Sequence, residues 1–328
     1  GGFGWPASPH RCTRRKTCRP TTDSAMRLAL KIDVDTFVGT QLGVPALLDI
    51  CQRHEAQASF LFSLGPDHTG RALRRVFRPG FLAKVSRTSV LEHYGLKTLL
   101  YGVLLPGPDI GRRCAPLMRT VRDAGFEVGV HTWDHILWQD FVVNEDRLWT
   151  ERLMRLAVNR HAEIFGAAPR VHCAAGWQMN AHAFALLETL GFTHASDTRG
   201  QAPYRPLIGG RPSRCVELPT TLPTLDELIG RPDLAGTSPV EHLLSLTDPA
   251  RAGATPRDHV YTLHAELEGR KLAGEFGQLL AGWKAQGYQL TSLGEYHASL
   301  DPGQLPSHEV VYDSVPGRYG VLAVEAAK

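Results

Sequence analysis

The chain has 328 residues, of which 43% are hydrophobic and 21% are charged, and its formal net charge is +3. This composition is typical of a globular protein with a substantial core, and it excludes a disordered chain. The first 25 residues carry five basic side chains and one acidic side chain, so the rest of the chain holds 31 basic and 32 acidic ones. This balance excludes a positive field over the whole surface, and we expect no nucleic-acid partner.

The N-terminal segment and the cysteines indicate the cellular compartment. Residues 1–25 contain no apolar run that would serve as the core of a signal peptide, so we expect a disordered leader or a misassigned start, with Met26 as the natural first residue. The four later cysteines form no Cys-x-x-Cys pair, which favours buried free thiols. No run of about 18 apolar residues is present to span a membrane. We therefore expect the reducing cytoplasm, with a peripheral membrane contact left open.

From Met26 onward, strand-like and helix-like segments alternate along the chain. The predicted strands are residues 27–35, 58–63, 127–131, 171–174, 193–197, 215–218, 259–264 and 288–292. The predicted helices are residues 44–55, 115–124, 145–165 and 181–190. This alternation predicts an α/β fold with parallel strands. No repeat of fixed period appears, which excludes a solenoid.

Residues 66–110 interrupt the alternation after the second predicted strand, and they are too many for an ordinary loop. The segment carries seven basic and three acidic side chains, has apolar residues at helix-like spacing, and contains the apolar run 98–105. These features predict an amphipathic helix at a membrane surface, with Arg74, Arg75 or Arg78 near a lipid phosphate. A helical hairpin packed on the body of the protein, with solvated arginines, is the alternative.

Polar side chains follow several predicted strands at their carboxyl ends. They are Asp33, Asp35, His131, Asp197 and His264. In a barrel of parallel strands, the carboxyl ends form the face on which active sites are built. The sequence therefore predicts one convergent site.

Two short motifs in this set indicate metal chemistry. Alternation along a strand places Asp33 and Asp35 on the same side, where one carboxylate can bind a metal and the other can act as a base. Taken alone, the pair is also compatible with solvated carboxylates or with a nucleotide-sugar glycosyltransferase. His131 and His135 have the spacing that projects two imidazoles from one face of a helical turn towards a shared cation. Two histidines and one aspartate suit Zn, Mn, Co, Fe or Ni equally well.

Three motifs carry a family resemblance. The segments 32–35, 131–135 and 263–264 resemble the first, second and fifth motifs of the polysaccharide deacetylases, the NodB-homology family of metal-dependent hydrolases of N-acyl sugars. The runs KIDVDTFVGTQLGVPALL, SFLFSLGPDHTGRALRRVFRPGFL, GVHTWDH, AAGW and VYTLHAELEG resemble one subgroup, the 4-deoxy-4-formamido-L-arabinose-phosphoundecaprenol deformylases. The resemblance covers about residues 27–300.

The resemblance implies a fold and a domain organisation. We expect a distorted (β/α)7–8 barrel of the NodB-homology type over residues 26–300, with a helical insertion after the second strand. Residues 301–328 are then expected to be a C-terminal tail.

The resemblance also implies a role for each site residue. Asp33 becomes the general base, His264 the general acid, and Asp35, His131 and His135 the ligands of one divalent metal ion. The implied reaction removes formyl from an aminosugar on undecaprenyl phosphate at the cytoplasmic face of the bacterial inner membrane, for lipid A modification and polymyxin resistance. The implied partners are this lipid-linked aminosugar and an anionic membrane surface, and no obligate protein partner is evident.

One family motif is missing from the sequence. Family members usually carry an Arg-x-Pro-Tyr-Gly type motif whose arginine orients the base, whereas Cys173 stands at that place here. We expect Arg199 to replace this arginine and Asp197 to orient His264. Trp177, in the AAGW run, is expected to contact the substrate or its lipid.

Three other functions compete with this interpretation. An N-acetyl-glycan deacetylase would release acetate instead of formate. A glycosyltransferase using Asp33 and Asp35 would consume a nucleotide sugar, but it leaves the histidine pair and His264 unexplained. A catalytically inactive metal-binding or lipid-binding module does not account for five positions occupied by chemically competent groups.

Overall fold

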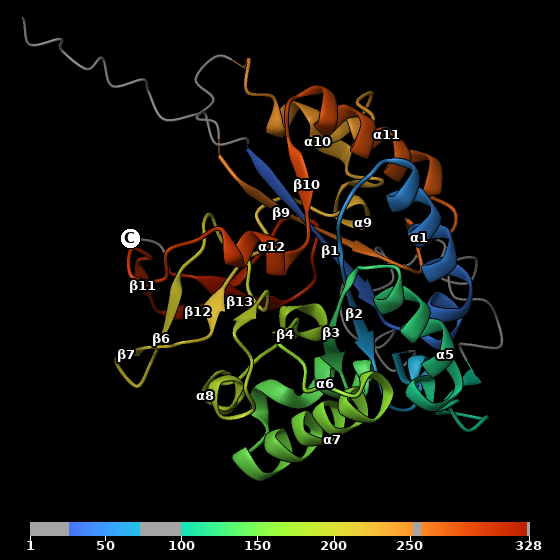
Figure 1. Cartoon of the computed structure of the whole chain (residues 1–328), viewed down its shortest axis with the longest axis vertical. Helices are drawn as coiled ribbons and strands as arrows, with labels where there is room; N and C mark the ends of the chain where they lie inside the picture. Colours follow the sequence, from blue (N-terminus) through green and yellow to red (C-terminus); the bar gives the residue numbers. More distant parts are fainter. Residues whose placement is uncertain (1–25, 73–99, 252–256, 327–328) are drawn as a thin grey trace, which may run out of the picture.

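The computed structural model describes residues 26–72, 100–251 and 257–326. Its main sheet confirms the predicted α/β fold, because all the strand pairs in it are parallel. The sheet runs in the order β10-β1-β2-β3-β4-β5-β8, and β9 pairs with β1 as well (Figure 1). Its strands are β1 (Arg27–Val34), β2 (Ser59–Ser63), β3 (Glu127–Thr132), β4 (Val171–His172), β5 (His194–Ala195), β8 (Val216–Glu217), β9 (His259–His264) and β10 (Gln289–Thr291).

The sheet is a curled half-barrel of parallel strands, which confirms the predicted distorted barrel, and the segment after β8 contacts β9. After β8, the Thr221 backbone N–H donates to the Val260 carbonyl of β9 at 3.1 Å. The Val260 N–H donates to the Thr221 hydroxyl at 3.0 Å. Parallel strands twist in one direction, so successive neighbours turn the sheet back towards its first strand.

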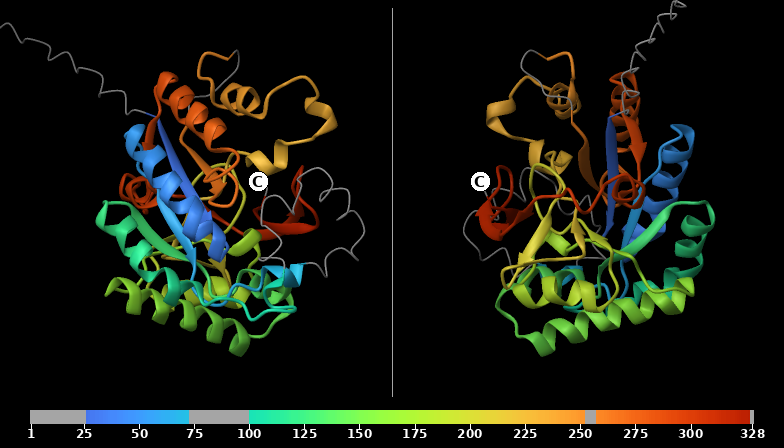
Figure 2. Two further views of the ribbon diagram at one scale, coloured as in Figure 1. Left: turned by 90° about the vertical axis from the view of Figure 1, so that its right-hand side faces the viewer. Right: turned by 60° about the vertical axis from the view of Figure 1, so that its left-hand side comes forward.

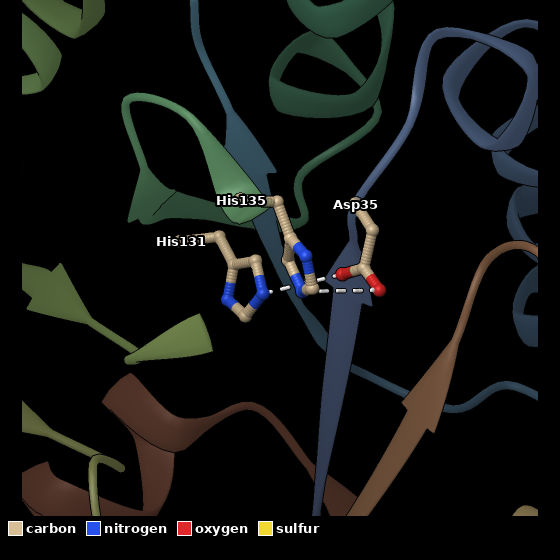
Figure 3. Close-up of side chains that lie close together, drawn as sticks. All are labelled: Asp35, His131 and His135. Carbon is tan, nitrogen blue, oxygen red and sulfur yellow. Dashed lines mark ion pairs between the residues drawn. The ribbon is translucent and has the colours of Figure 1, made fainter. Parts of the chain in front are cut away.

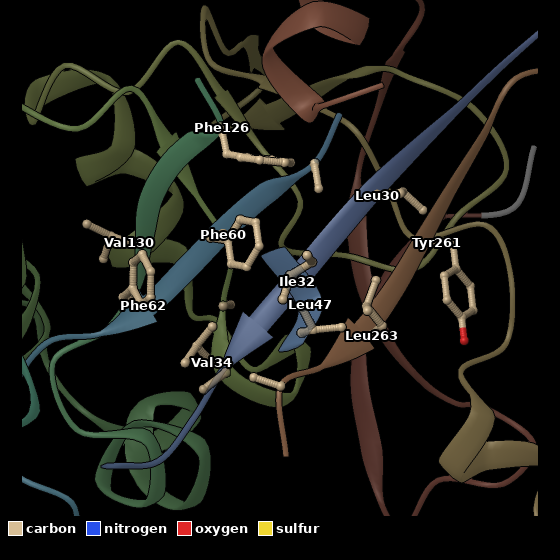
Figure 4. Packing of buried hydrophobic residues seen from close by; sticks show 14 of the residues in the cluster. Leu30, Ile32, Val34, Leu47, Phe60, Phe62, Phe126, Val130, Tyr261 and Leu263 are labelled. Carbon is tan, nitrogen blue, oxygen red and sulfur yellow. The ribbon is translucent and has the colours of Figure 1, made fainter. Parts of the chain in front are cut away.

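The residues of β1 divide between two hydrophobic cores because alternate side chains point to opposite faces of a strand. Leu30, Ile32 and Val34 belong to the outer core between sheet and helices, together with aromatic residues of β2 such as Phe60 (Figure 4). Ala29 belongs to a smaller cluster inside the curl. The side chains of Lys31 and Asp33 continue this inner face, and both residues are buried.

Helices cover the outer face of the sheet (Figure 2). Most of them begin at a side-chain cap; for example, the Asp146 carboxylate accepts a hydrogen bond from the Trp149 N–H at 2.8 Å. The helix predicted over 115–124 starts earlier, because Asp109 caps it by accepting from the Arg112 N–H. The α-helices are α1 (Val44–Arg53), α5 (Ile110–Asp123), α6 (His135–Phe141), α7 (Arg147–Phe165), α8 (Ala181–Thr189), α9 (Leu225–Leu228), α10 (Pro239–Thr247), α11 (Ala273–Ala285) and α12 (Leu293–Ala298).

The C-terminal region contains three strands within residues 307–325, where we predicted a tail. β12 (Val310–Ser314) and β13 (Val321–Glu325) make an antiparallel hairpin. The hairpin is attached to the loop after β5, because the Arg199 N–H donates to the Ala323 carbonyl and the Glu325 N–H donates to the Arg199 carbonyl. Three further short strands are β6 (Arg205–Ile208), β7 (Arg211–Pro212) and β11 (Ser307–His308), which form a separate three-stranded sheet.

The two ends of the predicted insertion 66–110 lie next to each other. The Asp67 N–H donates to the Pro108 carbonyl, and the Gly70 N–H donates to the Tyr101 carbonyl. Residues 73–99, with Arg74, Arg75 and Arg78, lie outside the described residues, as do residues 1–25. None of the helices in the described parts of the chain is long and apolar enough to cross a membrane. The four cysteines of those parts are buried free thiols, as predicted.

Candidate active site

Asp35, His131 and His135 converge at the carboxyl ends of β1 and β3 (Figure 3). One ligand atom of each lies within 4.8 Å of the others. Nε2 of His131 is 3.2 Å from Oδ1 of Asp35, and Nε2 of His135 is 3.3 Å from Oδ2 of Asp35. The two carboxylate oxygens thus face one imidazole each.

The histidine pair does not lie on one helical turn, so that prediction is wrong. His131 belongs to β3, and His135 is the first residue of α6 after a short bend. Their rings are nevertheless stacked, with centroids 5.3 Å apart. A strand end followed directly by a helix start therefore brings the two imidazoles together as effectively as a helical turn.

Neighbouring groups fix the orientation of these side chains. Nδ1 of His131 is 2.7 Å from the Cys173 carbonyl, so this nitrogen carries the proton and Nε2 offers its lone pair. Asp134 caps α6 by accepting from the Leu137 N–H at 3.0 Å, and its other oxygen lies 2.5 Å from Nδ1 of His68. The Cys173 carbonyl thus orients the His131 ring, and the Asp134 cap fixes the start of α6, where His135 lies.

The unpaired atoms and charges of this cluster fit a divalent metal ion. Oδ1 of Asp35 and Nε2 of His131 are buried without a hydrogen-bond partner among the described residues, and buried polar atoms of this kind need an explanation. Burial alone would raise the pKa of the Asp35 carboxyl, but His135 and His131 outweigh it and hold that pKa below its ordinary value. Two imidazoles and one carboxylate form a three-ligand set with positions open for water and substrate.

Asp33 and His264 are neighbours on adjacent strands of the sheet. They are register partners of the parallel pair β1 and β9, so their side chains leave the same face. Oδ2 of Asp33 is 3.5 Å from the ammonium of Lys31, and Oδ1 is 3.7 Å from Nδ1 of His131. Nδ1 of His264 is 3.9 Å from the carboxylate of Asp226.

Two similar proteins show the family to which this chain belongs. The chain is 34% identical over 307 residues to the probable 4-deoxy-4-formamido-L-arabinose-phosphoundecaprenol deformylase ArnD of Shewanella sediminis (strain HAW-EB3), covering 92% of this chain and 95% of the relative. It is 28% identical over 289 residues to the protein of the same name from Wigglesworthia glossinidia brevipalpis, covering 88% and 98%. The chain belongs to this deformylase family. It is therefore an amide hydrolase that acts on a carbon–nitrogen bond other than a peptide bond.

Solved structures agree with the deformylase fold. A protein of Mycobacterium smegmatis described as a polysaccharide deacetylase has a TM-score of 0.58 at 17% identity, covering 89% of this chain and 96% of the other. The chitin deacetylase of Colletotrichum lindemuthianum has a TM-score of 0.50 at 17% identity, with coverage of 86% and 91%. These likenesses confirm the polysaccharide-deacetylase fold. No model in a scan of protein families matches the sequence.

The cation beside Asp33 is Lys31, and the sequence did not identify it. Lys31 has no exposed surface, and its ammonium donates to the Ser196 carbonyl at 2.9 Å beside Asp33. Arg199, which we expected in this place, instead donates to Glu227 at 2.6 Å and to the Leu222 carbonyl at 3.0 Å. The alternation of β1 was a usable signal, because it places residues 31, 33 and 35 on one face.

Asp197 also has partners other than the expected one. Its Oδ1 accepts from Nδ1 of His172 at 2.8 Å and from the Ala174 N–H at 2.7 Å, whereas the carboxylate beside His264 is that of Asp226. Asp226 comes from α9, a four-residue helix that has no periodic signal in the sequence. Asp197 therefore stabilises the loop after β4.

Trp177 is buried among three cations. Its ring faces the Lys31 ammonium at 4.9 Å and the guanidinium carbons of Arg199 and Arg318 at 5.0 and 4.7 Å. With only 2% of its surface exposed, Trp177 supports the cations around the site by cation–π contacts. Its predicted contact with substrate stays a prediction.

Buried glutamates hold the backbone of the loops that carry the site. Glu266 accepts from the N–H groups of Asp35 and Thr36 at 3.1 and 2.8 Å, and a Cβ on Gly39 would lie 1.9 Å from its Oε1. A side chain at position 39 would therefore displace the Glu266 carboxylate from these N–H groups. Glu268 accepts from the His264 N–H at 2.9 Å, and burial raises its pKa to about 7.

Proposed function

We propose that this deformylase removes the formyl group from a 4-formamido sugar carried on undecaprenyl phosphate. The observation that carries the proposal is the meeting of Asp33, His264 and the cluster of Asp35, His131 and His135 in a chain of this family. The names of both relatives specify this type of substrate. An N-acetyl-glycan deacetylase is the second candidate, because the same groups would hydrolyse an acetamide.

The proposed mechanism assigns proton transfers to Asp33 and His264. A divalent metal ion held by Asp35, His131 and His135 would supply a Lewis acid that polarises the amide carbonyl. The Asp33 carboxylate, held beside the Lys31 ammonium, takes a proton from the attacking water as its oxygen bonds to the formyl carbon. His264 gives a proton to the amine nitrogen as the carbon–nitrogen bond breaks. The products are formate and the free aminosugar.

An apolar surface segment near the site supports a lipid-linked substrate. Val103, Leu104 and Leu105 are 54%, 76% and 39% exposed. The segment adjoins the site, because a Cβ on Gly102 would lie 2.8 Å from the His68 ring, and His68 is bonded to Asp134 next to His135. We propose that this segment meets the undecaprenyl chain at the cytoplasmic face of the inner membrane, where the reaction serves lipid A modification and polymyxin resistance. A phosphate contact by Arg74, Arg75 or Arg78 stays a prediction.

The product and the metal content test the proposed reaction. Purified protein incubated with undecaprenyl-phosphate 4-formamido-arabinose is expected to release formate, measured by mass spectrometry. His135→Ala should lose metal and activity together, while Asp33→Asn should keep the metal and lose about 10²–10⁴-fold in turnover. Release of acetate from an N-acetyl glycan without formate from the lipid would favour the second candidate. Full activity of Asp33→Asn would remove Asp33 as the base.

A pair of leucines with nearly equal exposure tests the lipid contact. Leu104 is 76% exposed and Leu148 of α7 is 78% exposed. Leu104→Ser should weaken binding to anionic vesicles and slow hydrolysis of the long-chain substrate, with a water-soluble short-chain analogue unaffected. Leu148→Ser serves as the control. Equal effects of the two substitutions would contradict a specific role for the segment around Leu104.

A further inference from the structure

Arg318 reaches the site from the C-terminal hairpin, which lies outside the predicted barrel. It belongs to the loop between β12 and β13, and its side chain is 13% exposed. Its Nε donates to Glu227 at 2.7 Å, and one terminal nitrogen lies 3.3 Å from Oδ1 of Asp226. The same nitrogen is 3.3 Å from the Thr224 hydroxyl. The guanidinium therefore binds the start of α9 at several points.

Two further features fix the position of this guanidinium. Its central carbon lies 4.7 Å from the centre of the Trp177 ring, and the Trp177 indole N–H donates to the Thr220 hydroxyl at 3.1 Å. The preceding residue, Gly317, has φ +86°, and a Cβ there would lie 2.5 Å from the Glu227 carbonyl oxygen. The loop can approach α9 this closely only with glycine at that position.

The contacts of Arg318 lead to His264 through one carboxylate. Asp226 lies between the Arg318 guanidinium and Nδ1 of His264, at 3.3 and 3.9 Å. That nitrogen is buried with no hydrogen-bond partner among the described residues. Glu227, on the other side of the guanidinium, is also held by Arg199. Burial would raise its pKa, but the two arginines outweigh burial and lower it, so Glu227 is ionised.

We propose that Arg318 is a positioning residue, which holds the Asp226 carboxylate at Nδ1 of His264 and thereby directs Nε2 of that imidazole towards the departing amine. The proposal rests on the proposed function, because it takes His264 as the proton donor. A carboxylate at one ring nitrogen fixes the tautomer and the orientation of a histidine. Arginine suits the task because its planar fork binds two carboxylates at once and stacks on an aromatic ring.

A purely structural role for Arg318 is the competing explanation. The hairpin is also attached through the backbone of Arg199, which pairs with Ala323 and Glu325. Loss of the Arg318 side chain is therefore expected to leave the hairpin in place. A positioning role and a structural role then differ in their effect on turnover.

The test compares Arg318→Gln with the same substitution at another arginine near α9. Arg231, just after α9, donates to Asp233 at 3.0 Å and serves as the control. Arg318→Gln should lower kcat for formate release by about 10–100-fold with KM and metal content unchanged, and Arg318→Lys should recover part of this loss. The double variant Arg318→Gln, Asp226→Asn should have a kcat little lower than that of Arg318→Gln, because both substitutions remove the orientation of His264 by Asp226. The proposal would be overturned if Arg318→Gln had the same kcat as Arg231→Gln. It would also be overturned if the kcat losses of Arg318→Gln and Asp226→Asn multiplied fully in the double variant.

A second measurement separates this proposal from the proposed function. In protein with ¹⁵N-labelled histidine, the His264 ring signals are assigned by comparison with His264→Gln. They should move in Arg318→Gln, while those of His182, an exposed residue of α8, should not. Unchanged His264 signals would overturn the positioning role whether or not the protein turns over. A wild-type protein that releases no formate would overturn only the proposed function.

Discussion

At the scale of single residues, Lys31 shows how the site accommodates a buried positive charge. Its ammonium is completely buried, and a buried charge is tolerated only when it is paired and hydrogen-bonded. The Asp33 carboxylate and the Ser196 carbonyl supply those partners. Both residues belong to β1, so the strand places the ammonium and the carboxylate side by side.

Removal of the Lys31 charge alone should lower the free energy of unfolding more than removal of the charges of both Lys31 and Asp33. Lys31→Met leaves the Asp33 carboxylate buried without its cation, and we expect the free energy of unfolding of the metal-free protein to fall by about 3 kcal/mol. The double variant Lys31→Met, Asp33→Asn should recover most of this loss. Urea unfolding of the three proteins measures it. A double variant as unstable as Lys31→Met would show that the ammonium is stabilised by groups other than Asp33.

The sequence predicts some of the site residues because they stand in short motifs at strand ends. Asp35, His131 and His135 are of this kind, and the structure brings them together. Arg199 and Asp197 stand in the loop after β5, and a sequence does not specify towards which neighbour a loop side chain turns. Their contacts with Glu227 and His172 depend on the path of the chain after β5.

At the scale of elements, the start of α6 carries a candidate metal ligand. His135 is the first residue of α6, and Asp134 is its cap. A cap satisfies a backbone N–H group of the first turn that has no partner within the helix. The orientation of the His135 ring therefore depends on a hydrogen bond made by the residue before it.

Loss of this cap should weaken metal binding. Asp134→Ala removes the bond to the Leu137 N–H and the contact with His68, so we expect about 1 kcal/mol less stability and about 10-fold weaker metal binding. Isothermal titration calorimetry with Zn²⁺ and thermal unfolding measure the two effects. Asp146→Ala, at the cap of α7, should lose similar stability and keep its metal affinity. Equal affinity of both variants for Zn²⁺ would contradict the link.

The predicted elements match the structure where an element is long enough for its hydrophobic periodicity to be recognised in the sequence. The strand expected at 259–264 is β9, and the helix expected at 145–165 is α7 with a slightly later start. The two-residue strand β7 and the four-residue helix α9 are too short to show a period. The C-terminal hairpin was missed because its strand β12 is largely exposed, so its residues do not alternate between apolar and polar.

At the scale of the whole molecule, buried histidines connect stability to pH. His259, at the start of β9, is 3% exposed, and its Nδ1 lies 3.0 Å from the Thr221 hydroxyl. Burial, aided by the charge of Arg257, lowers its pKa from 6.5 to about 4. The unfolded chain therefore binds this proton more tightly than the folded protein. The stability contributed by the neutral ring is complete above pH 6.5 and is lost as the pH falls towards 4.

A substitution at His259 should reduce the dependence of stability on pH. Between pH 7 and pH 5, the wild-type protein should lose about 2 kcal/mol of unfolding free energy through this residue. His259→Asn, which keeps a polar atom near Thr221, should lack that loss, as measured by urea unfolding at both pH values. The exposed His182→Asn is the control. An unchanged difference between the two pH values in His259→Asn would show that other groups cause the acid sensitivity.

The pairing of β1 with β9 has a consequence for synthesis of the chain. Asp33 and His264 are register partners separated by about 230 residues, and a ribosome adding about 5–20 residues per second needs roughly 10–50 s to travel between them. Throughout that time the nascent β1 has one edge without its final neighbour, and an open strand edge is prone to pair with other chains. We therefore expect the emerging N-terminal half to need protection from such pairing, and a polypeptide released before His259 contains the proposed metal ligands but neither the proposed proton donor nor the strand that pairs with this edge of β1.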